Sequence, residues 1–273
     1  LNESMWYGYP PLFFPMVRAN VRALDTLQVY TANKFQWNLK EFSAGGASKW
    51  GWLTWLFAAV DTRVVSFVPV VFDMLNWNAN AHHQYKSYGG WTWAFEDYWE
   101  EGLTAYLDTE MEKNLFNTID PYVFRANYEG KPKIVLHNGR DEFFMPDDTW
   151  YWWNNMTEPK WTLLVPNTEH AGITGLGETL PAISTWVYAT LMLDYDKVIP
   201  KITWTLDHDT YTIEAQTNMM PISARIWYTE SCRDCKDRRD FRALSLDSPC
   251  PSGIVLSGKC YNLNSIWLQE EIE

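Results

Sequence analysis

Residues 45–51 of the chain read Gly-Gly-Ala-Ser-Lys-Trp-Gly. They fall where an expected strand (39–44) gives way to a helix expected from Ser48 to about residue 59. A serine on a sharp strand-to-helix turn is typical of a nucleophile elbow, and the small residues before it allow strained backbone and close packing. Because a helix N-terminus favours developing negative charge, the backbone N–H of Lys49 is expected to be an oxyanion-hole donor.

The elbow departs from the usual pattern G-x-S-x-G at one position. Trp50 stands where the second glycine is expected, and Gly51 follows one residue later, as in S-x-x-G variants. The alternative interpretation of Ser48 is an ordinary helix cap, since serine is favoured at that position.

Apolar, β-branched runs downstream of the elbow predict strands that are buried on both faces. These runs are 64–72, 132–138 and 161–165, and helices are expected at 16–36, 146–156 and 176–193. The alternation predicts a parallel sheet with helices on both faces, which is an α/β fold. Together with the strand expected over 39–44, these runs give only four strands, fewer than is usual for this sheet. We therefore expect earlier strands to be missing from this chain.

Two departures from the alternation define the expected domains. Residues 73–128 are rich in Trp, Tyr, Asn, His and acidic residues and predict a helical cap inserted into an α/β-hydrolase-like domain that spans 1–199. After Pro200 the pattern changes to period two, with strands expected at 201–206, 210–216 and 223–228. Residues 200–273 therefore predict a small all-β domain, a partial C-terminal β-sandwich.

A nucleophile requires a base, and the base requires an orienting carboxylate. Asp141 follows the expected strand 132–138, and His170 follows the next strand, so the order Ser, acid, His is that of an α/β-hydrolase. Ser48, Asp141 and His170 are the predicted triad, with Glu142 as the nearest rival for the acid. The alternatives for Asp141 are a solvated loop acid or a helix cap, and the alternative for His170 is an ordinary loop histidine.

The chain contains 17 Trp, 15 Tyr and 13 Phe, which fits either a thick core or an aromatic-lined pocket. The substrate pocket is predicted to include Trp50, His82, His83, Trp91, Trp93 and Glu96. Glu96 otherwise belongs to a solvated helix face, and Asp73 is expected to shape the pocket from the end of its strand. No carboxylate stands at a ligand spacing from the two histidines, so neither a metal nor another cofactor is expected.

Composition limits the compartment and the partners. A net charge of −12 argues against nucleic acid as a partner, and no apolar run reaches the ~18 residues of a membrane span. For Cys232, Cys235, Cys250 and Cys260, two disulfides, free thiols and a zinc site remain open. With sequons at Asn2 and Asn155, the cysteines favour a secreted or exported glycoprotein.

Several motifs together resemble the PhoPQ-activated pathogenicity-related proteins, whose eukaryotic members include autocrine proliferation repressor proteins. The motifs are G-A-S-K-W-G-W-L-T-W-L, Y-G-G-W-T-W-A-F-E-D-Y-W-E-E-G, N-G-R-D-E-F-F-M-P-D, V-P-N-T-E-H and R-I-W-Y-T-E-S. The resemblance covers about residues 15 to 245. It implies an α/β-hydrolase-like domain, a small β domain, export, and the family's Ser, Asp and His at Ser48, Asp141 and His170. Trp50 departs from the family, which usually carries Arg there.

Three functions are compatible with these observations. The first is a serine hydrolase, a peptidase or esterase that acts on a small peptide or ester. The second is a secreted, non-enzymatic signalling protein on a hydrolase scaffold, with a cell-surface receptor as its partner. The third is a carbohydrate esterase whose tryptophans stack on sugar rings. The first rests partly on analogy between folds.

Overall fold

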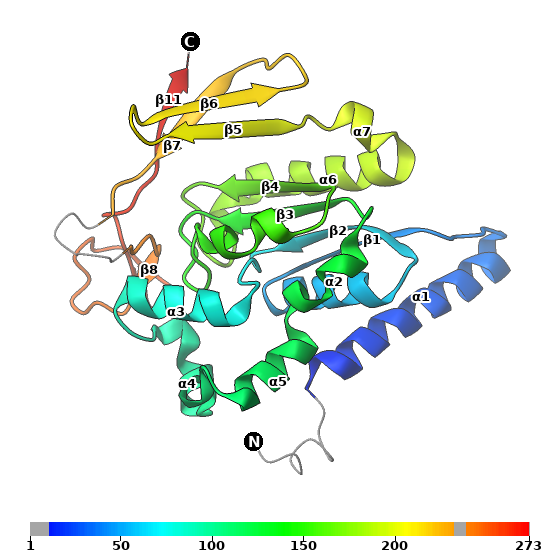
Figure 1. Ribbon diagram of the computed structural model, residues 1–273, viewed down its shortest axis with the longest axis horizontal. Helices are drawn as coiled ribbons and strands as arrows, with labels where there is room; N and C mark the ends of the chain where they lie inside the picture. The colour runs from blue at the N-terminus through cyan, green and yellow to red at the C-terminus, as the bar shows by residue number, and fades with distance from the viewer. Residues whose placement is uncertain (1–10, 232–238, 273) are drawn as a thin grey trace.

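The computed structural model describes residues 11–231 and 239–272. At its centre lies a four-stranded parallel sheet in the order β1-β2-β3-β4 (Figure 1). The strands are β1 (Phe42–Ala47), β2 (Val64–Val70), β3 (Lys133–Asn138) and β4 (Lys160–Val165). The four expected strands and the parallel sheet are thereby confirmed, although β1 begins and ends three residues later than the strand expected over 39–44.

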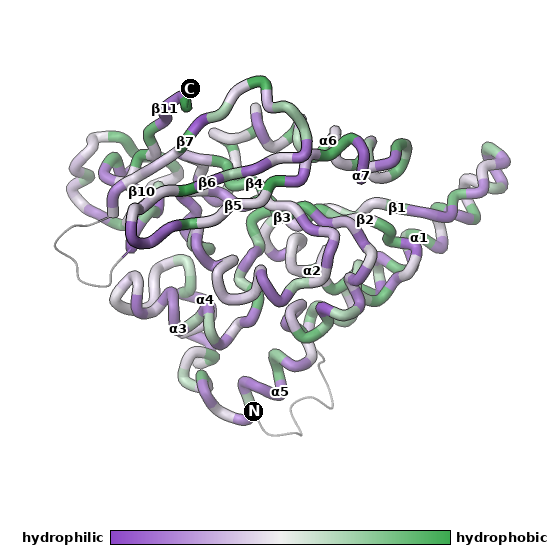
Figure 2. Tube along the Cα trace, turned by 45° about the horizontal axis from the view of Figure 1, so that its top comes forward, coloured by the Kyte–Doolittle hydropathy of each residue, from purple (hydrophilic) through white to green (hydrophobic). Residues whose placement is uncertain are grey.

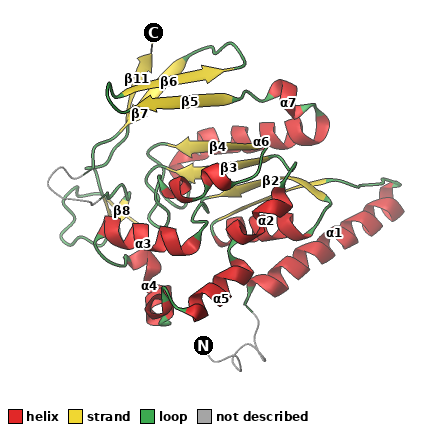
Figure 3. Ribbon diagram, viewed as in Figure 1, coloured by secondary structure: helices red, strands yellow, loops and turns green. Residues whose placement is uncertain are grey.

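Helices cover both faces of this sheet (Figure 3). On one face, α2 (Lys49–Val60) lies between the sheet and α1 (Phe13–Phe35), and its residues 51–58 are all buried. A helix that is apolar on all sides suits this interior position. Trp55 of α2 is fully buried among the rings of Phe67, Tyr128 and Trp152.

The other face is covered by α6 (Leu176–Met192), whose Trp186 packs on Val68 and Leu136. The short helix α7 (Tyr195–Val198) follows it. Strand β2 is buried against both helical layers, which explains its continuous apolar run.

The region expected to be a cap is helical, and its helices α3, α4 and α5 follow one another along one side of the molecule (Figure 1). Its helices are α3 (Trp77–Tyr88), η2 (Trp93–Phe95), α4 (Glu96–Glu100), η3 (Leu103–Tyr106), α5 (Glu110–Ile119) and η4 (Pro121–Tyr128). Stacked rings of Trp52, Trp77 and Phe116 join the cap to α2. Much of the aromatic content therefore forms core.

The prediction of a helix over 146–156 is wrong. This segment holds two short 3₁₀ helices, η5 (Asp148–Tyr151) and η6 (Trp153–Asn155). The Asp148 carboxylate accepts the backbone N–H of Met145, and the Trp152 indole donates to the carbonyl of Asp73. Such side-chain to backbone hydrogen bonds compete with a regular helix.

Beyond α7 the described elements are strands. They are β5 (Ile202–Asp207), β6 (Thr212–Thr217), β7 (Ala224–Tyr228), β8 (Leu244–Ser245), β9 (Val255–Leu256), β10 (Lys259–Tyr261) and β11 (Leu268–Ile272). Where the sequence predicted a partial sandwich, they form three small antiparallel sheets, namely β5-β6, β7-β11 and β8-β10-β9. Figure 2 shows hydrophobic and hydrophilic residues interspersed along β5 and β6.

In the described part of this region, Cys250 and Cys260 form a disulfide. Of the three alternatives left open by the sequence, the structure therefore shows a disulfide for these two cysteines, and not free thiols or zinc ligands. Cys232 and Cys235 lie outside the described residues.

Candidate active site

Ser48 occupies the turn between β1 and α2 in a strained conformation, with φ of 56° and ψ of −124°. Its backbone N–H donates to the carbonyl of Val70 over 2.9 Å, which fixes the turn against β2. Non-glycine residues rarely adopt a positive φ, and such strain concentrates at functional sites. The Ser48 side chain makes no capping hydrogen bond to α2, so the helix-cap alternative does not describe it.

The two glycines around Ser48 explain the spacing of the motif. A Cβ at Gly46 would lie 2.6 Å from the carbonyl oxygen of Trp50, and one at Gly51 would lie 2.8 Å from that of Val70. Gly51 therefore permits α2 to approach β2 closely, as a glycine in G-x-S-x-G does one residue earlier. Trp50, in the usual glycine position, is exposed and meets no such limit.

The structure brings Ser48, His170 and Asp141 into one hydrogen-bonded chain. Ser48 Oγ lies 2.8 Å from His170 Nε2, and His170 Nδ1 lies 2.8 Å from Asp141 Oδ2. Asp141 and His170 stand on the loops that follow the adjacent strands β3 and β4. This is the relative placement that a nucleophile, a base and an orienting acid require.

The two neighbouring acids of the β3 loop make different contacts. Asp141 is buried, accepts the backbone N–H groups of Phe143 and Phe144, and faces the imidazole. Glu142 accepts the backbone N–H of His170 over 2.9 Å. The geometry therefore favours Asp141 over its rival as the partner of the His170 ring, and Glu142 holds the histidine's main chain.

The electrostatic surroundings of His170 favour its charged form. Burial by itself would lower the pKa of His170, but the negative charge of Asp141 and its hydrogen bond outweigh burial and raise that pKa above the ordinary value. An imidazolium produced by proton uptake from Ser48 is thus stabilised where it would form.

The Glu142 carboxyl gives a prediction of pH-dependent stability. Burial raises its pKa to about 7, although the hydrogen bond from His170 lowers it in part. The folded state therefore binds this proton more tightly than the unfolded state, so stability is lost as the pH rises toward 7. We expect Glu142→Gln to increase the free energy of unfolding by roughly 2 kcal/mol at pH 8.5 and by much less at pH 5.

Urea denaturation at the two pH values measures this difference. Glu129→Gln, which changes an exposed glutamate, is the matched control and should have little effect at either pH. An equal gain at both pH values for Glu142→Gln would contradict the assigned cause.

The C-terminal segment supports both loops of the site. Arg140, next to Asp141, is fully buried and donates to the Tyr261 hydroxyl and to the carbonyl of Asn262. Trp267 donates its indole N–H to the carbonyl of Gly139, and its backbone exchanges two hydrogen bonds with the Asn167 side chain. Residues 261–267 thus fix the backbone on either side of the candidate site.

Lys49 and Trp93 are predicted oxyanion and pocket residues that lie on the side of Ser48 and His170. Lys49 begins α2, so its backbone N–H has no acceptor within the helix. The Trp93 ring lies 5.9 Å from that of Phe143, which in turn lies 4.3 Å from the His170 ring.

The other predicted pocket residues have different surroundings. Trp91 packs on Phe95 inside the cap, and Glu96 is exposed on α4. His82 and His83 pair with carboxylates, Asp108 and Asp147 respectively. Among these predicted pocket residues, Trp93 is the one whose ring is connected to His170, through the ring of Phe143.

Sequence reasoning missed several contacts of the site. Phe143 and Phe144 pack against the His170 ring, and the only signal for them was their place directly after the predicted acid. Asp73 was expected to shape the pocket, but it is fully buried and its Oδ2 pairs with His137 Nδ1 over 3.0 Å. A strand residue, His137, is thus the buried partner of Asp73.

A parallel sheet, a strained serine between β1 and α2, and an acid and a histidine on the next two strand loops define an α/β-hydrolase scaffold. The chain belongs to the PhoPQ-activated pathogenicity-related protein family, whose sequence model matches residues 7–242. It is 32% identical over 253 residues to autocrine proliferation repressor protein A of Dictyostelium discoideum. That match covers 89% of this chain and 49% of the relative, so the chain spans about half of the relative's length.

Solved α/β structures are more distantly similar. Acetyl xylan esterase 1 from Thermoanaerobacterium is 19% identical with a TM-score of 0.43, over 60% of this chain and 52% of its own. An acylaminoacyl peptidase from Pyrococcus horikoshii is 12% identical with a TM-score of 0.45, over 64% of this chain and 29% of its own.

Proposed function

We propose that this protein is a secreted serine hydrolase that transfers the acyl group of a small peptide or ester to Ser48 and then to water. The hydrogen-bonded chain from Ser48 through His170 to Asp141 is the observation that carries the proposal. The α/β-hydrolase scaffold is compatible with hydrolysis, and the positions of the three side chains support the chemical roles proposed for them.

In the proposed reaction, Ser48 Oγ attacks the acyl carbon while His170 Nε2 takes the hydroxyl proton. Asp141 holds the imidazole with Nδ1–H toward its carboxylate and stabilises the imidazolium. The backbone N–H of Lys49 donates to the oxyanion. His170 then gives the proton to the leaving amine or alcohol as the bond between this group and the acyl carbon breaks. In the second half of the reaction, a water molecule deprotonated by His170 attacks the acyl-enzyme, and the proton passes to Ser48 Oγ as the acid is released.

Two features support the choice of small substrates that carry an apolar group. The rings of Phe143 and Phe144 lie directly against His170, and Trp93 extends this aromatic wall toward the cap. Aromatic walls with a few polar groups are typical of small-molecule sites. We propose that the leaving group contacts this wall, so that its size and polarity determine the preferred substrate.

Secretion is part of the proposal. The Cys250–Cys260 disulfide fits an oxidising compartment, and Asn155 of the sequon at 155–157 is exposed and accessible to glycosylation. Among the described residues, no helix is long and apolar enough to span a bilayer.

A second candidate function follows from the relative's name. Autocrine proliferation repressor protein A is named for an effect on cells, which favours a signalling role with a receptor as partner. A hydrolytic site and a receptor contact can coexist on one scaffold, so the decisive question is whether the serine is required.

A panel of acyl substrates tests the proposed activity. The panel contains p-nitrophenyl acetate, longer p-nitrophenyl esters, aminoacyl and dipeptidyl amides, and acetylated sugars. We expect turnover of at least one class, together with an acyl adduct on the peptide that carries Ser48 in quenched reactions analysed by mass spectrometry. A folded protein that hydrolyses none of these classes and forms no adduct would favour the signalling function. Turnover of acetylated sugars alone would assign a carbohydrate esterase.

A further inference from the structure

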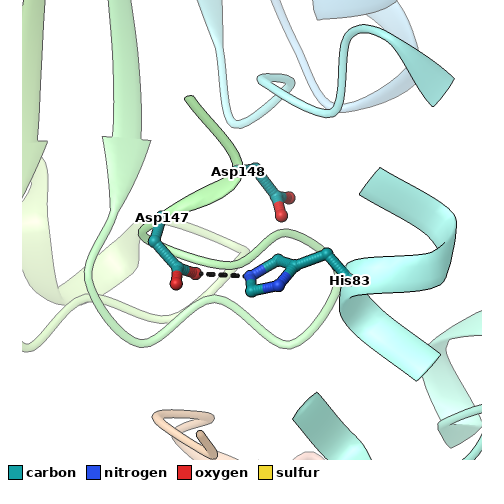
Figure 4. Close-up of side chains that lie close together, drawn as sticks. All are labelled: His83, Asp147 and Asp148. Atoms are coloured by element: carbon teal, nitrogen blue, oxygen red, sulfur yellow. Dashed lines mark hydrogen bonds and ion pairs between the residues drawn. The ribbon is translucent and has the colours of Figure 1, made fainter. Parts of the chain in front are cut away.

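A histidine and two aspartates meet outside the candidate active site. His83 lies on α3 of the cap, and Asp147 and Asp148 lie at the start of η5, in the segment that follows the triad acid (Figure 4). One nitrogen or oxygen atom from each side chain lies within 4.8 Å of the others. The three side chains converge from two elements far apart in the sequence.

Asp148 is the member of this cluster that requires explanation. It is fully buried, and its Oδ2 accepts the backbone N–H of Met145. Its Oδ1 is buried with no hydrogen-bond partner. Figure 4 shows its carboxylate directed toward the space beside His83 and Asp147. A buried carboxylate oxygen without a donor is costly, and binding to a cation is one way to satisfy it.

The other two members are already arranged as ligands. Asp147 Oδ1 lies 2.9 Å from His83 Nε2, and Asp147 Oδ2 lies 2.6 Å from Arg239. Arg239 therefore contacts the oxygen that does not face His83, which is how an outer partner orients a ligating carboxylate. Ser87 lies 3.4 Å from His83 Nδ1 and helps to set the ring's orientation.

We propose that His83, Asp147 and Asp148 bind a divalent transition-metal ion of the zinc type. One imidazole nitrogen and two carboxylate oxygens suit such an ion, whereas Ca²⁺ and Mg²⁺ prefer oxygen ligands only. In the metal-bound form His83 is the neutral tautomer with its proton on Nδ1, toward Ser87 Oγ, so that the Nε2 lone pair faces the metal instead of Asp147. Both aspartates bind as carboxylates, and the proton held by the buried Asp148 carboxyl goes to solvent. A cavity of about 580 Å³ lined by His83, Asp147, Tyr151 and Arg239 gives access for the ion and for a water molecule as fourth ligand.

The metal site would connect the cap to the segment that carries the proposed catalytic acid. His83 belongs to the cap, and the two aspartates belong to the segment that begins with Asp141. A bound ion would fasten the cap to this segment, so its principal effect is on stability. The sequence spacing hid the site, because no carboxylate stands near His83 along the chain.

Metal titration of the full chain tests the proposal. After chelator treatment and buffer exchange, we expect Zn²⁺ to bind saturably at one ion per chain in calorimetry and to raise the melting temperature, and Ca²⁺ to do neither. Co²⁺ should give visible d–d absorption of a low-coordinate site with nitrogen and oxygen ligands.

Two ligand variants and one control distinguish this site from adventitious binding. His83→Gln and Asp148→Asn should each weaken Zn²⁺ binding at least tenfold, by removing a ligand without changing the side chain's size greatly. Burial raises the pKa of the Asp148 carboxyl well above its usual range, so Asp148→Asn replaces one neutral buried side chain by another of similar size, and this variant is expected to fold. His82→Gln is the matched control, since His82 is its exposed neighbour on α3 and pairs with Asp108.

Weakened binding in both ligand variants, with binding retained in His82→Gln, supports the site. No saturable Zn²⁺ binding by the folded protein would overturn the proposal, and so would binding that persists in Asp148→Asn or is lost in His82→Gln. None of these readouts depends on hydrolytic activity.

Discussion

Replacing Ser48 with alanine is expected to reduce turnover of any substrate that the protein hydrolyses by about 10⁴-fold or more. The expectation follows from the covalent role proposed for Ser48 Oγ, for which neither the His170 imidazole nor the Lys49 N–H can substitute. The residual rate would come from oxyanion stabilisation and substrate binding alone. Steady-state kinetics on the best substrate of the panel measures the effect.

The control for this variant is Ser184→Ala, which removes an exposed hydroxyl on α6. It should retain full activity, and both variants should show the same secondary structure by circular dichroism. If the folded Ser48→Ala protein retained turnover within a few-fold of the unchanged protein, Ser48 would not be the nucleophile.

Trp55→Ala is expected to lower the free energy of unfolding by about 3–5 kcal/mol. The Trp55 side chain is fully buried between α2 and the sheet, makes ring contacts with Phe67, Tyr128 and Trp152, and donates its indole N–H to the carbonyl of Phe72. Truncation leaves a large cavity and an unpaired carbonyl in the core, which surrounding rings cannot fill. Chemical denaturation measures the loss.

Trp50→Ala provides the matched comparison within the same helix. The Trp50 side chain is 60% exposed, so its removal should change the free energy of unfolding by less than about 0.5 kcal/mol. Similar losses for the two variants would contradict the placement of α2 with Trp55 toward the sheet.

The α/β core was predictable from sequence because its signals are local. Continuous apolar runs marked β2, β3 and β4, and the glycines around Ser48 marked the elbow. The order of Ser48, Asp141 and His170 placed their side chains at one edge of the sheet, since parallel strands end there together. The structure shows these three side chains hydrogen-bonded to one another.

The remaining features depend on contacts between distant segments. Asp148 accepts the backbone N–H of Met145, and the Trp152 indole donates to the carbonyl of Asp73. With these bonds the segment 146–156 forms 3₁₀ turns instead of the expected helix. The pairing of His83 with Asp147, and of Asp73 with His137, joins residues that no spacing rule connects. The packing of residues 261–267 on the loops of the site is equally invisible in a linear pattern.

Covalent labelling of the protein with a fluorophosphonate, followed by peptide mapping, tests the proposed role of Ser48 directly. Such probes react with a serine whose hydroxyl is activated by a neighbouring base. We expect a phosphonyl adduct on Ser48, with labelling lost in Ser48→Ala and strongly reduced in His170→Ala. A well-folded protein that takes up no probe, or that carries the adduct at a different residue, would contradict the central claim that Ser48, His170 and Asp141 form a catalytic triad.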